Sequence, residues 1–268
     1  MHKTDTIWSF CSGDTGGNAA GVHLLTEVIS ASTMQQIAQE VGYSETVFIQ
    51  IMDSRHIKMR YFTPVEEVDL CGHATIAAFY WLLQNNHINV GEYVLVTDKA
   101  RLMVWVDVDK IFMEQPPVQI TRISKSNLNL LLDLSEAIDI ETEIYAASTG
   151  ITDLMLPFKT IAGLENFTPD FDFISQVCIK LGVQGIHAYS KSNDKEYYVR
   201  NFAPLLGINE ESATGTSNCA LSGLLDLTQN GSHEFTFLQG MRMEEPSIIY
   251  TRRLAVGQYS VGGSCRSR

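Results

Sequence analysis

The stretch DLCGHAT, residues 69–75, places a cysteine, a glycine and a histidine directly before an apolar, helix-like run. Cys71 could act as a thiolate in the field of that helix start, and His73 could carry a proton. Each residue also has an ordinary structural interpretation. A free cysteine is often a small buried residue, and a histidine can cap its own helix. Local sequence alone leaves both interpretations open.

Two expected helix starts could bind an anion. A helix amino terminus offers N–H groups without intrahelical partners and a partial positive charge, which favour a carboxylate. Gly72 is followed by His73 at the first start, and Gly215 by Thr216 at the second. A glycine there can also do no more than permit a tight turn from strand to helix. Because the two glycines occupy equivalent places in a repeated unit, we favour a role in binding.

Glu45, in the stretch YSETVF (43–48), is the candidate acid/base. It stands at the start of an expected apolar strand, where a carboxylate can take up and release a proton. The alternative is a strand-edge glutamate that faces solvent. Its counterpart in the repeat is Gly185, so the carboxylate belongs to one half of the chain only. A single acid/base group would produce this broken symmetry.

The elements that position these residues come from an internal repeat. Residues 32–64 align without a gap with 172–204, a displacement of 140 residues. The identical residues are Gln36, Gly42, Arg60, Phe62 and Pro64, which match Gln176, Gly182, Arg200, Phe202 and Pro204. In each copy, apolar residues spaced by three and four mark one face of a helix. Each copy is therefore predicted to read helix, glycine stop, strand, turn and strand.

Each copy is followed by a second helix, near 73–84 and near 216–229, with few charges. A helix that is apolar nearly all round should be buried by the strands of its own half. The sequence thus predicts two similar lobes of mixed helix and strand, 1–117 and 118–250, with a break at Pro116 and Pro117. The cleft expected between such lobes is the default place for a small-molecule site.

Composition narrows the classes of partner and compartment. The formal net charge of −12 gives no overall attraction to nucleic acid or to an anionic membrane. The five cysteines form no CxxC pair and no short cluster with histidine, which argues against a disulfide framework and a zinc site. The chain shows no signal-peptide core and no apolar run long enough to cross a bilayer. We expect a cytoplasmic protein.

A dinucleotide site is not favoured either. The glycine cluster GDTGGNAAG (13–21) lacks the GxGxxG pattern and precedes a strand-like run.

Several motifs together resemble the phenazine-biosynthesis PhzF-like proteins, over essentially the whole chain. In order, they are GGNAAGV, YSETVF, MRYFTPVEEVDLCGHAT, AASTG, VRNFAPLLGINEESATGTSNCA and QGMRMEEPS. The resemblance implies an α/β (α+β) fold of the diaminopimelate-epimerase-like type. Such a fold has two pseudo-symmetric lobes, each a curved mixed sheet wrapped around a central helix. It also implies that the last strand, within 251–268, returns to the first lobe, and that the protein is a homodimer.

The same resemblance implies an isomerase that moves a proton on a small carboxylated substrate between the lobes, with no cofactor and no metal. Glu45 corresponds to the acid/base, and Gly72 and His73 to the Gly-His motif of the substrate site. The family usually has Asp-Pro and Ser where this chain has Glu211-Ser212 and Thr216, which indicates a pocket of different size. We predict as catalytic Glu45, His73 and Glu211, and as substrate-binding Asn18, Gly72, Gly215 and Thr216.

Two alternatives remain open from sequence. The chain could keep this fold as a binding or regulatory protein without turnover, because fold does not determine function. It could also be a cysteine-dependent amino-acid racemase or epimerase. Related epimerases use one cysteine in each lobe, and Cys71 stands where the first would be. The second lobe has Ser212 at the corresponding place, with Cys219 about one helical turn further on, so we disfavour this alternative.

Overall fold

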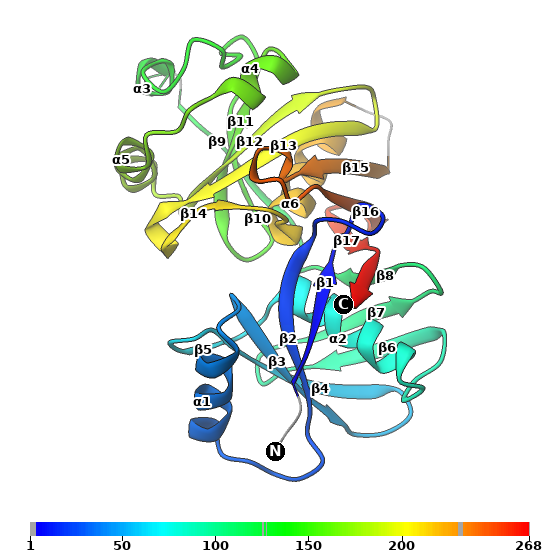
Figure 1. Cartoon of the computed structure of the whole chain (residues 1–268). Coiled ribbons are helices and arrows are strands. Elements are labelled where there is room, and N and C mark those ends of the chain that lie inside the picture. Colours follow the sequence, from blue (N-terminus) through cyan, green and yellow to red (C-terminus); the bar gives the residue numbers. More distant parts are fainter. Residues whose placement is uncertain (1–3, 125, 127, 230–232, 268) are drawn as a thin grey trace. The chain divides into compact units, whose positions relative to one another are not determined.

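The structure, a computed structural model, describes residues 4–124, 126, 128–229 and 233–267. Its helices are α1 (Ala31–Val41), α2 (Gly72–Gln84), α3 (Leu128–Leu132), α4 (Ile161–Asn166), α5 (Phe171–Leu181) and α6 (Gly215–Gln229). Its strands are β1 (Asp5–Ser9), β2 (Asn18–Leu24), β3 (Glu45–Ile51), β4 (His56–Phe62), β5 (Glu67–Val68), β6 (Gly91–Val96), β7 (Arg101–Val106), β8 (Ile111–Glu114), β9 (Gln119–Arg122), β10 (Tyr145–Ser148), β11 (Thr152–Pro157), β12 (Gly185–Lys191), β13 (Glu196–Ala203), β14 (Ile208–Glu211), β15 (Glu234–Gln239), β16 (Ser247–Ala255), β17 (Gln258–Gly263) and β18 (Cys265–Ser267). Figure 1 labels these elements.

The chain divides into two compact units. Unit 1 comprises residues 1–114 with 262–268, and unit 2 comprises residues 115–261. The division falls near the predicted break at Pro116. The return to unit 1 begins at Gly262, later than the predicted residue 251. The physical reason is that β16 pairs antiparallel with β15 and so lies in the sheet of unit 2.

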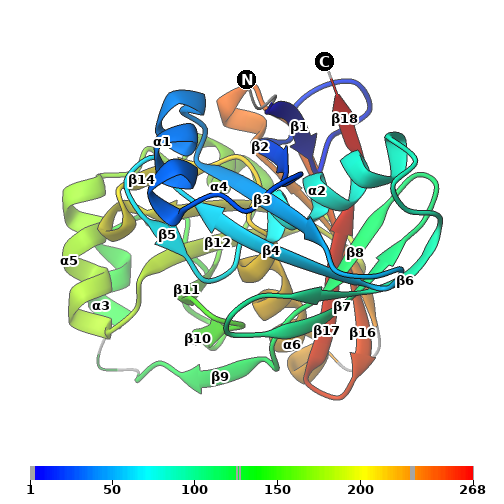
Figure 2. The ribbon, with the colours of Figure 1, turned by 90° about the horizontal axis from the view of Figure 1, so that it is seen from below.

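Unit 1 contains a mixed sheet that begins at β18 and proceeds through β1, β2, β3, β4, β6 and β7 to β8. The pairs β18–β1, β1–β2, β3–β4, β6–β7 and β7–β8 are antiparallel, whereas β2–β3 and β4–β6 are parallel. The short strand β5 adds to β4. Helix α1 lies against β3 and β4 (Figure 2). It crosses over between the parallel strands β2 and β3.

Unit 2 repeats the order of parallel and antiparallel pairs found from β18 to β7. Its sheet proceeds from β9 through β10, β11, β12, β13 and β15 to β16, with parallel pairs only at β11–β12 and β13–β15. Phe62 opposes Thr46 in unit 1, and Phe202 opposes Ile186 in unit 2, which keeps the displacement of 140 residues. The repeat predicted from sequence is therefore confirmed as two copies of one fold.

The first helix of each copy ends at the predicted glycine. Gly42 follows α1 with φ of 74°, and Gly182 follows α5 with φ of 69°. This left-handed conformation favours glycine, because a Cβ atom would crowd the backbone there. The opposite ends are capped by side chains: Ser30 accepts from the N–H of Thr33, and Asp170 from that of Phe173.

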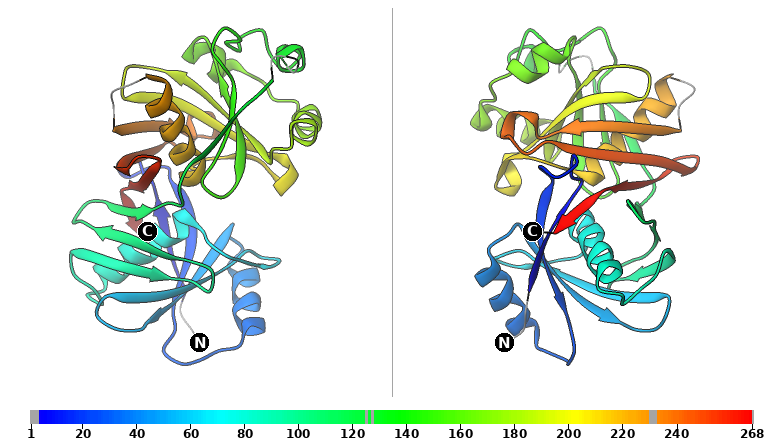
Figure 3. Two further views of the ribbon diagram at one scale, coloured as in Figure 1. Left: turned by 180° about the vertical axis from the view of Figure 1, so that it is seen from behind. Right: turned by 45° about the vertical axis from the view of Figure 1, so that its right-hand side comes forward.

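The second helix of each copy is the centre of its unit. Helix α2 contacts strands from both ends of the sheet, from β18 and β1 to β7 and β8, so the sheet curves around it (Figure 3). Helix α6 similarly contacts β9, β10, β11, β15 and β16. From His73 to Phe79, every residue of α2 is buried. The expectation that these helices are buried because they are apolar all round is confirmed.

An ion pair that occurs in both copies of the repeat orients the strand before each central helix. Arg60 donates two hydrogen bonds to Glu67 on β5, and Arg200 donates two to Glu210 on β14. Successive side chains of a strand point to opposite faces. Because Arg200 holds Glu210 on one face of β14, Glu211 is presented on the other face, next to the start of α6.

In the described part of the chain, no helix combines the length and the apolar character that crossing a bilayer requires.

Candidate functional site

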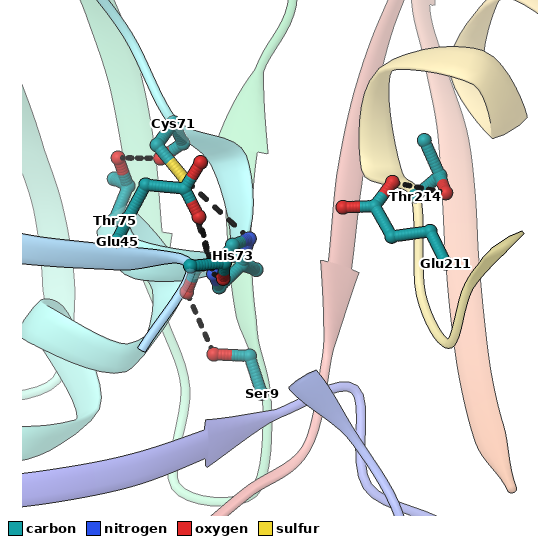
Figure 4. Close-up of polar contacts among 8 residues, drawn as sticks. Ser9, Glu45, Cys71, His73, Thr75, Glu211 and Thr214 are labelled. Atoms are coloured by element: carbon teal, nitrogen blue, oxygen red, sulfur yellow. Dashed lines mark hydrogen bonds and ion pairs between the residues drawn. The ribbon is translucent and has the colours of Figure 1, made fainter. Parts of the chain in front are cut away.

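Unit 1 brings Glu45 and His73 together. Glu45 is the first residue of β3, and His73 is the second residue of α2. The distance from Glu45 Oε2 to His73 Nε2 is 3.3 Å, and both side chains are largely buried (Figure 4). Glu45 Oε2 is buried and takes part in no hydrogen bond with the described residues. A buried carboxylate oxygen without a donor is uncommon and marks a candidate for proton transfer.

His73 is held in place by its neighbours. Ser9 donates a hydrogen bond to the His73 carbonyl oxygen at 2.7 Å, and Ser44 Oγ lies 3.4 Å from Nε2. Burial lowers the pKa of His73 below its ordinary value, although the Glu45 carboxylate and a hydrogen bond with the Ala19 backbone oppose the shift. The imidazole is therefore neutral at neutral pH. It can orient Glu45, but it carries no positive charge to offer a substrate.

Cys71 lies beside the imidazole of His73. Its Sγ is 3.4 Å from Nδ1 and 4.0 Å from Nε2, so the sulfur faces the side of the ring rather than one lone-pair axis. The donor atoms of Glu45, Cys71 and His73 lie within 4.8 Å of one another, and each is a type that Zn²⁺ accepts. Sequence spacing did not indicate this group, because Glu45 comes from a different strand.

Gly72 has open space where a side chain would be. A Cβ atom built on Gly72 meets no other atom within 4 Å, and its φ is not in the left-handed region. The fold itself therefore does not require glycine at this position. Asn18 begins β2 and pairs with Ser9, the residue that donates to the His73 carbonyl. Asn18 and Gly72 are thus both adjacent to His73.

Unit 2 brings Glu211 to the start of α6. Thr214 donates a hydrogen bond from Oγ1 to Glu211 Oε2 at 2.7 Å (Figure 4). Gly215 and Thr216 are the first residues of the helix. Thr149, in the AASTG motif after β10, donates to the Thr216 carbonyl oxygen at 3.1 Å. Two motifs far apart in sequence therefore meet at one helix start.

The strand register explains why Glu45 has no counterpart in unit 2. Glu45 neighbours Ala20 across β2–β3, whereas Gly185 neighbours Asp153 across β11–β12. A Cβ on Gly185 would lie 2.7 Å from Asp153 Oδ1, so the aspartate occupies the space that a side chain there would need. Unit 2 thus carries its carboxylate on the neighbouring strand, where it is almost completely buried at 2% exposure.

Asp153 should make stability depend on pH. Burial raises its pKa from 3.8 to about 6, while hydrogen bonds from Ser217 and Asn201 partly oppose this. A raised folded-state pKa contributes stability below pH 3.8, which is lost as pH rises toward 6. We expect Asp153→Asn, which cannot ionise, to gain about 2 kcal/mol relative to wild type between pH 4 and pH 7. Urea unfolding at both pH values measures this difference, and a constant difference would contradict it.

The predicted site residues thus form two groups. Asn18, Glu45, Gly72 and His73 lie together in unit 1, and Glu211, Gly215 and Thr216 lie together in unit 2. Their catalytic and binding roles stay predictions. Sequence reasoning missed Ser9, Ser44, Thr214 and Gln239, which contact these residues. Ser44, Thr214 and Gln239 lie within the motifs YSETVF, VRNFAPLLGINEESATGTSNCA and QGMRMEEPS, although the sequence did not reveal their roles, whereas Ser9 lies in none of the motifs.

Comparison with known proteins identifies relatives over most of the chain. The family model described as phenazine biosynthesis-like protein matches residues 7–264. An uncharacterized isomerase from Deinococcus radiodurans is 32% identical over 238 residues, which cover 84% of this chain and 76% of that protein. The resemblance seen in the motifs is therefore confirmed.

Solved structures confirm the fold. A phenazine biosynthesis protein of the PhzF family from Bacillus anthracis superposes with a TM-score of 0.85 at 24% identity, covering 99% of this chain and 97% of that one. A hydroxyproline epimerase from Agrobacterium vitis, with bound trans-4-hydroxy-L-proline, gives a TM-score of 0.66 at 11% identity, over 99% and 90%. These likenesses show the epimerase-like fold that the motifs implied.

Proposed function

The chain belongs to the phenazine biosynthesis-like protein family, and from this premise we propose that it is an isomerase. Glu45 moves a proton between two carbon atoms of a small carboxylated substrate, with no organic cofactor and no metal. Curated relatives named as isomerases, such as the one from Deinococcus radiodurans, support the reaction class.

One observation carries the proposed role of Glu45. Its Oε2 is buried, takes part in no hydrogen bond with the described residues, and lies 3.3 Å from Nε2 of His73. A base must have a lone pair that can reach the proton it removes. The imidazole of His73, whose pKa is lowered by burial, lies beside this oxygen.

The proposed step balances within the substrate. The Glu45 carboxylate takes a proton from a C–H bond, and the electron pair of that bond delocalises toward the substrate carboxylate. The substrate for such a step carries a C=C bond next to that C–H bond. The electron pair of the broken C–H bond forms a new C=C bond, and the carboxylic acid of Glu45 returns the proton to the far carbon atom of the original C=C bond. No electrons are gained or lost, so the reaction needs no oxidant or reductant.

The substrate carboxylate is proposed to bind at the start of α2. The first N–H groups of a helix have no intrahelical partners and lie at its positive end. Such donors also stabilise the negative charge that develops when the C–H bond breaks. The open space beside Gly72 supports this location, because a bulky residue there would approach the same N–H groups.

Gly72→Ala is expected to reduce activity without harming the fold. Alanine is the better helix former, so stability should stay equal or rise by up to about 1 kcal/mol, while a methyl group beside the helix start should slow exchange by about tenfold. Gly223→Ala in α6 is the contrasting variant, because its Cβ would lie 2.8 Å from Val118 and should cost stability. Unchanged exchange in Gly72→Ala would place the substrate elsewhere.

The start of α6 is proposed as a second group that takes part in the reaction, with Glu211 and Thr216 as its polar side chains. Their support is the equivalent placement of Gly72 and Gly215 as first residues of the two central helices. The asymmetric carboxylates, Glu45 in one copy and Glu211 in the other, give the two helix starts different chemistry.

Deuterium uptake from heavy water into a panel of amino acids and cyclic carboxylates tests the proposal. Wild type should label at least one member at a carbon-bound position, and Glu45→Gln should not. The assay is performed with and without a chelator, because the proposed chemistry needs no metal and should survive chelation.

A thiol-dependent racemase is the second candidate, and the position of Cys71 beside His73 is what favours it. Its weakness lies in unit 2. Cys219 is completely buried, and burial raises the pKa of its thiol, so it is a poor proton carrier. We expect Cys71→Ser to keep most of the exchange activity. A loss as large as that of Glu45→Gln would favour the racemase instead.

A further inference from the structure

Gln239, in the motif QGMRMEEPS, is the last residue of β15 and is completely buried. Its side-chain amide uses every hydrogen-bonding position. Nε2 donates to the Glu211 carbonyl oxygen at 2.8 Å and to Thr214 Oγ1 at 2.9 Å. Oε1 accepts from the Thr214 N–H at 3.1 Å and from Asn218 Nδ2 at 3.0 Å. One side chain thus joins both ends of the turn from Glu211 to Thr214.

The direction of these hydrogen bonds is set deeper in unit 2. Asn201 Nδ2 lies 3.2 Å from His187 Nδ1, and an amide nitrogen can only donate, so Nδ1 accepts. Burial lowers the pKa of His187 to about 4, which keeps the ring neutral with its proton on Nε2. Nε2 therefore donates to Asn218 Oδ1 at 3.1 Å. The orientation of the Asn218 amide follows from this bond.

From Asn218 onward, each group donates toward Glu211. Asn218 Nδ2 donates to Gln239 Oε1, and Gln239 Nε2 donates to Thr214 Oγ1. Because the Thr214 oxygen accepts that bond, its own hydrogen is directed to Glu211 Oε2 at 2.7 Å. Hydrogen bonds arranged head to tail polarise one another in a buried setting. The chain therefore ends with a fixed donor on the Glu211 carboxylate.

The residue after Gln239 leaves no room for this turn to move. Gly240 has φ of 76°, and a Cβ there would lie 2.8 Å from the Ser212 carbonyl oxygen and 2.2 Å from that of Glu245. Only glycine permits such a close approach of two backbone segments in this conformation. Gln239 thus contacts the turn through its side chain, and Gly240 contacts it through its backbone.

Among the residues of unit 1 that the structure describes, no equivalent arrangement is found. The register of the parallel pairs β4–β6 and β13–β15 places Thr97, the residue after β6, where Gln239 stands. The Thr97 hydroxyl oxygen accepts from the N–H groups of Lys99 and Ala100 in its own turn. Likewise Cys71 precedes α2 where Thr214 precedes α6. The amide network is therefore not a consequence of the shared fold. It is found in the unit that carries Glu211.

We propose that Gln239 is a positioning residue that acts through Thr214 to hold the Glu211 carboxylate in a single orientation. This inference rests on the proposed function for its catalytic consequence, because Glu211 matters only if it takes part in the reaction. Its structural part, the link from Gln239 to Glu211, can be measured without a substrate.

The test follows the titration midpoint of the Glu211 carboxyl by carbon-13 NMR. Gln239→Leu removes the donor that orients Thr214, and Thr214→Val removes the hydroxyl itself while keeping the shape. Each should raise the midpoint by about 0.5 to 1 pH unit, because the charged carboxylate loses a hydrogen bond. The double variant should shift no further than Thr214→Val alone, since both act through one bond. Ser222→Ala is the control. Ser222 lies in α6, and its buried hydroxyl is hydrogen-bonded to Thr251 on β16, so its loss should leave the midpoint of Glu211 unchanged.

An unchanged midpoint in folded Gln239→Leu, or additive shifts in the double variant, would overturn the proposal. If Gln239→Leu does not fold, an unchanged midpoint in Thr214→Val overturns it equally. Deuterium exchange separates this result from the proposed function. Gln239→Leu should slow exchange about tenfold in wild type and not at all in a Glu211→Gln background. If Glu211→Gln exchanges normally, its proposed role in the reaction fails while the midpoints still decide the role of Gln239.

Discussion

Glu45→Gln is expected to lower the rate of deuterium incorporation by roughly 10²- to 10⁴-fold, the usual contribution of a general acid/base. Glutamine has the size and shape of glutamate and can still contact Nε2 of His73, but its amide cannot take up a proton. The loss should therefore appear in the rate and not in stability. Proton NMR of a labelled panel substrate in heavy water measures the rate, and urea unfolding measures stability.

The matched control is Glu40→Gln, the same chemical change at an exposed position of α1 in the same unit. It should exchange at the wild-type rate. A Glu45→Gln protein that folds and exchanges as fast as Glu40→Gln would contradict the proton-transfer role of Glu45. Loss of exchange together with a large loss of stability would instead indicate that Glu45 supports the fold.

Arg200→Ala is expected to destabilise unit 2 by about 3 to 5 kcal/mol, the usual cost of removing one partner of a buried ion pair. The Arg200 side chain is only 6% exposed. Besides Glu210, it donates to the carbonyl oxygens of Leu164 and Phe167 at 3.0 and 2.7 Å. Its removal leaves a largely buried carboxylate and two carbonyl groups without their donor. Equilibrium unfolding in urea measures the loss.

Arg60→Ala provides the comparison within the same molecule. The repeat places Arg60 at the equivalent position, but its side chain is 26% exposed and that of its partner Glu67 is 39% exposed. Exposed ion pairs contribute about 1 kcal/mol or less, because water solvates both charges when the pair breaks. Equal losses in the two variants would contradict the view that burial, and not the repeat itself, sets the cost.

Much of the fold could be predicted because it depends on local patterns. The spacing of Met34, Ile37 and Val41 predicted α1, and Gly42 predicted its end, since a helix face and a left-handed stop involve only nearby residues. The buried state of α2 followed from its lack of charged residues. The match of 32–64 with 172–204 predicted two copies of one unit, which the strand registers confirm.

Contacts between distant strands could not be predicted in the same way. The return of the chain to unit 1 begins at Gly262 and not at residue 251, because strand-like residues of β16 could pair with either sheet. The motif QGMRMEEPS was visible, but its contact with Glu211 joins residues 28 positions apart. Pairing over such separations depends on the whole sheet and leaves no local spacing to read.

The sequence by itself determined the family, the repeated unit and the identity of the candidate acid/base, because apolar periodicity, glycine stops and motif order are properties of short segments. Only the tertiary structure decided the environment of each polar group. It placed Glu45 Oε2 beside a neutral His73 and put Cys71 at the side of the same ring. It also buried Asp153 where Gly185 leaves space. Desolvation and hydrogen-bond direction, which control proton affinity, depend on atoms that the folded chain brings from elsewhere.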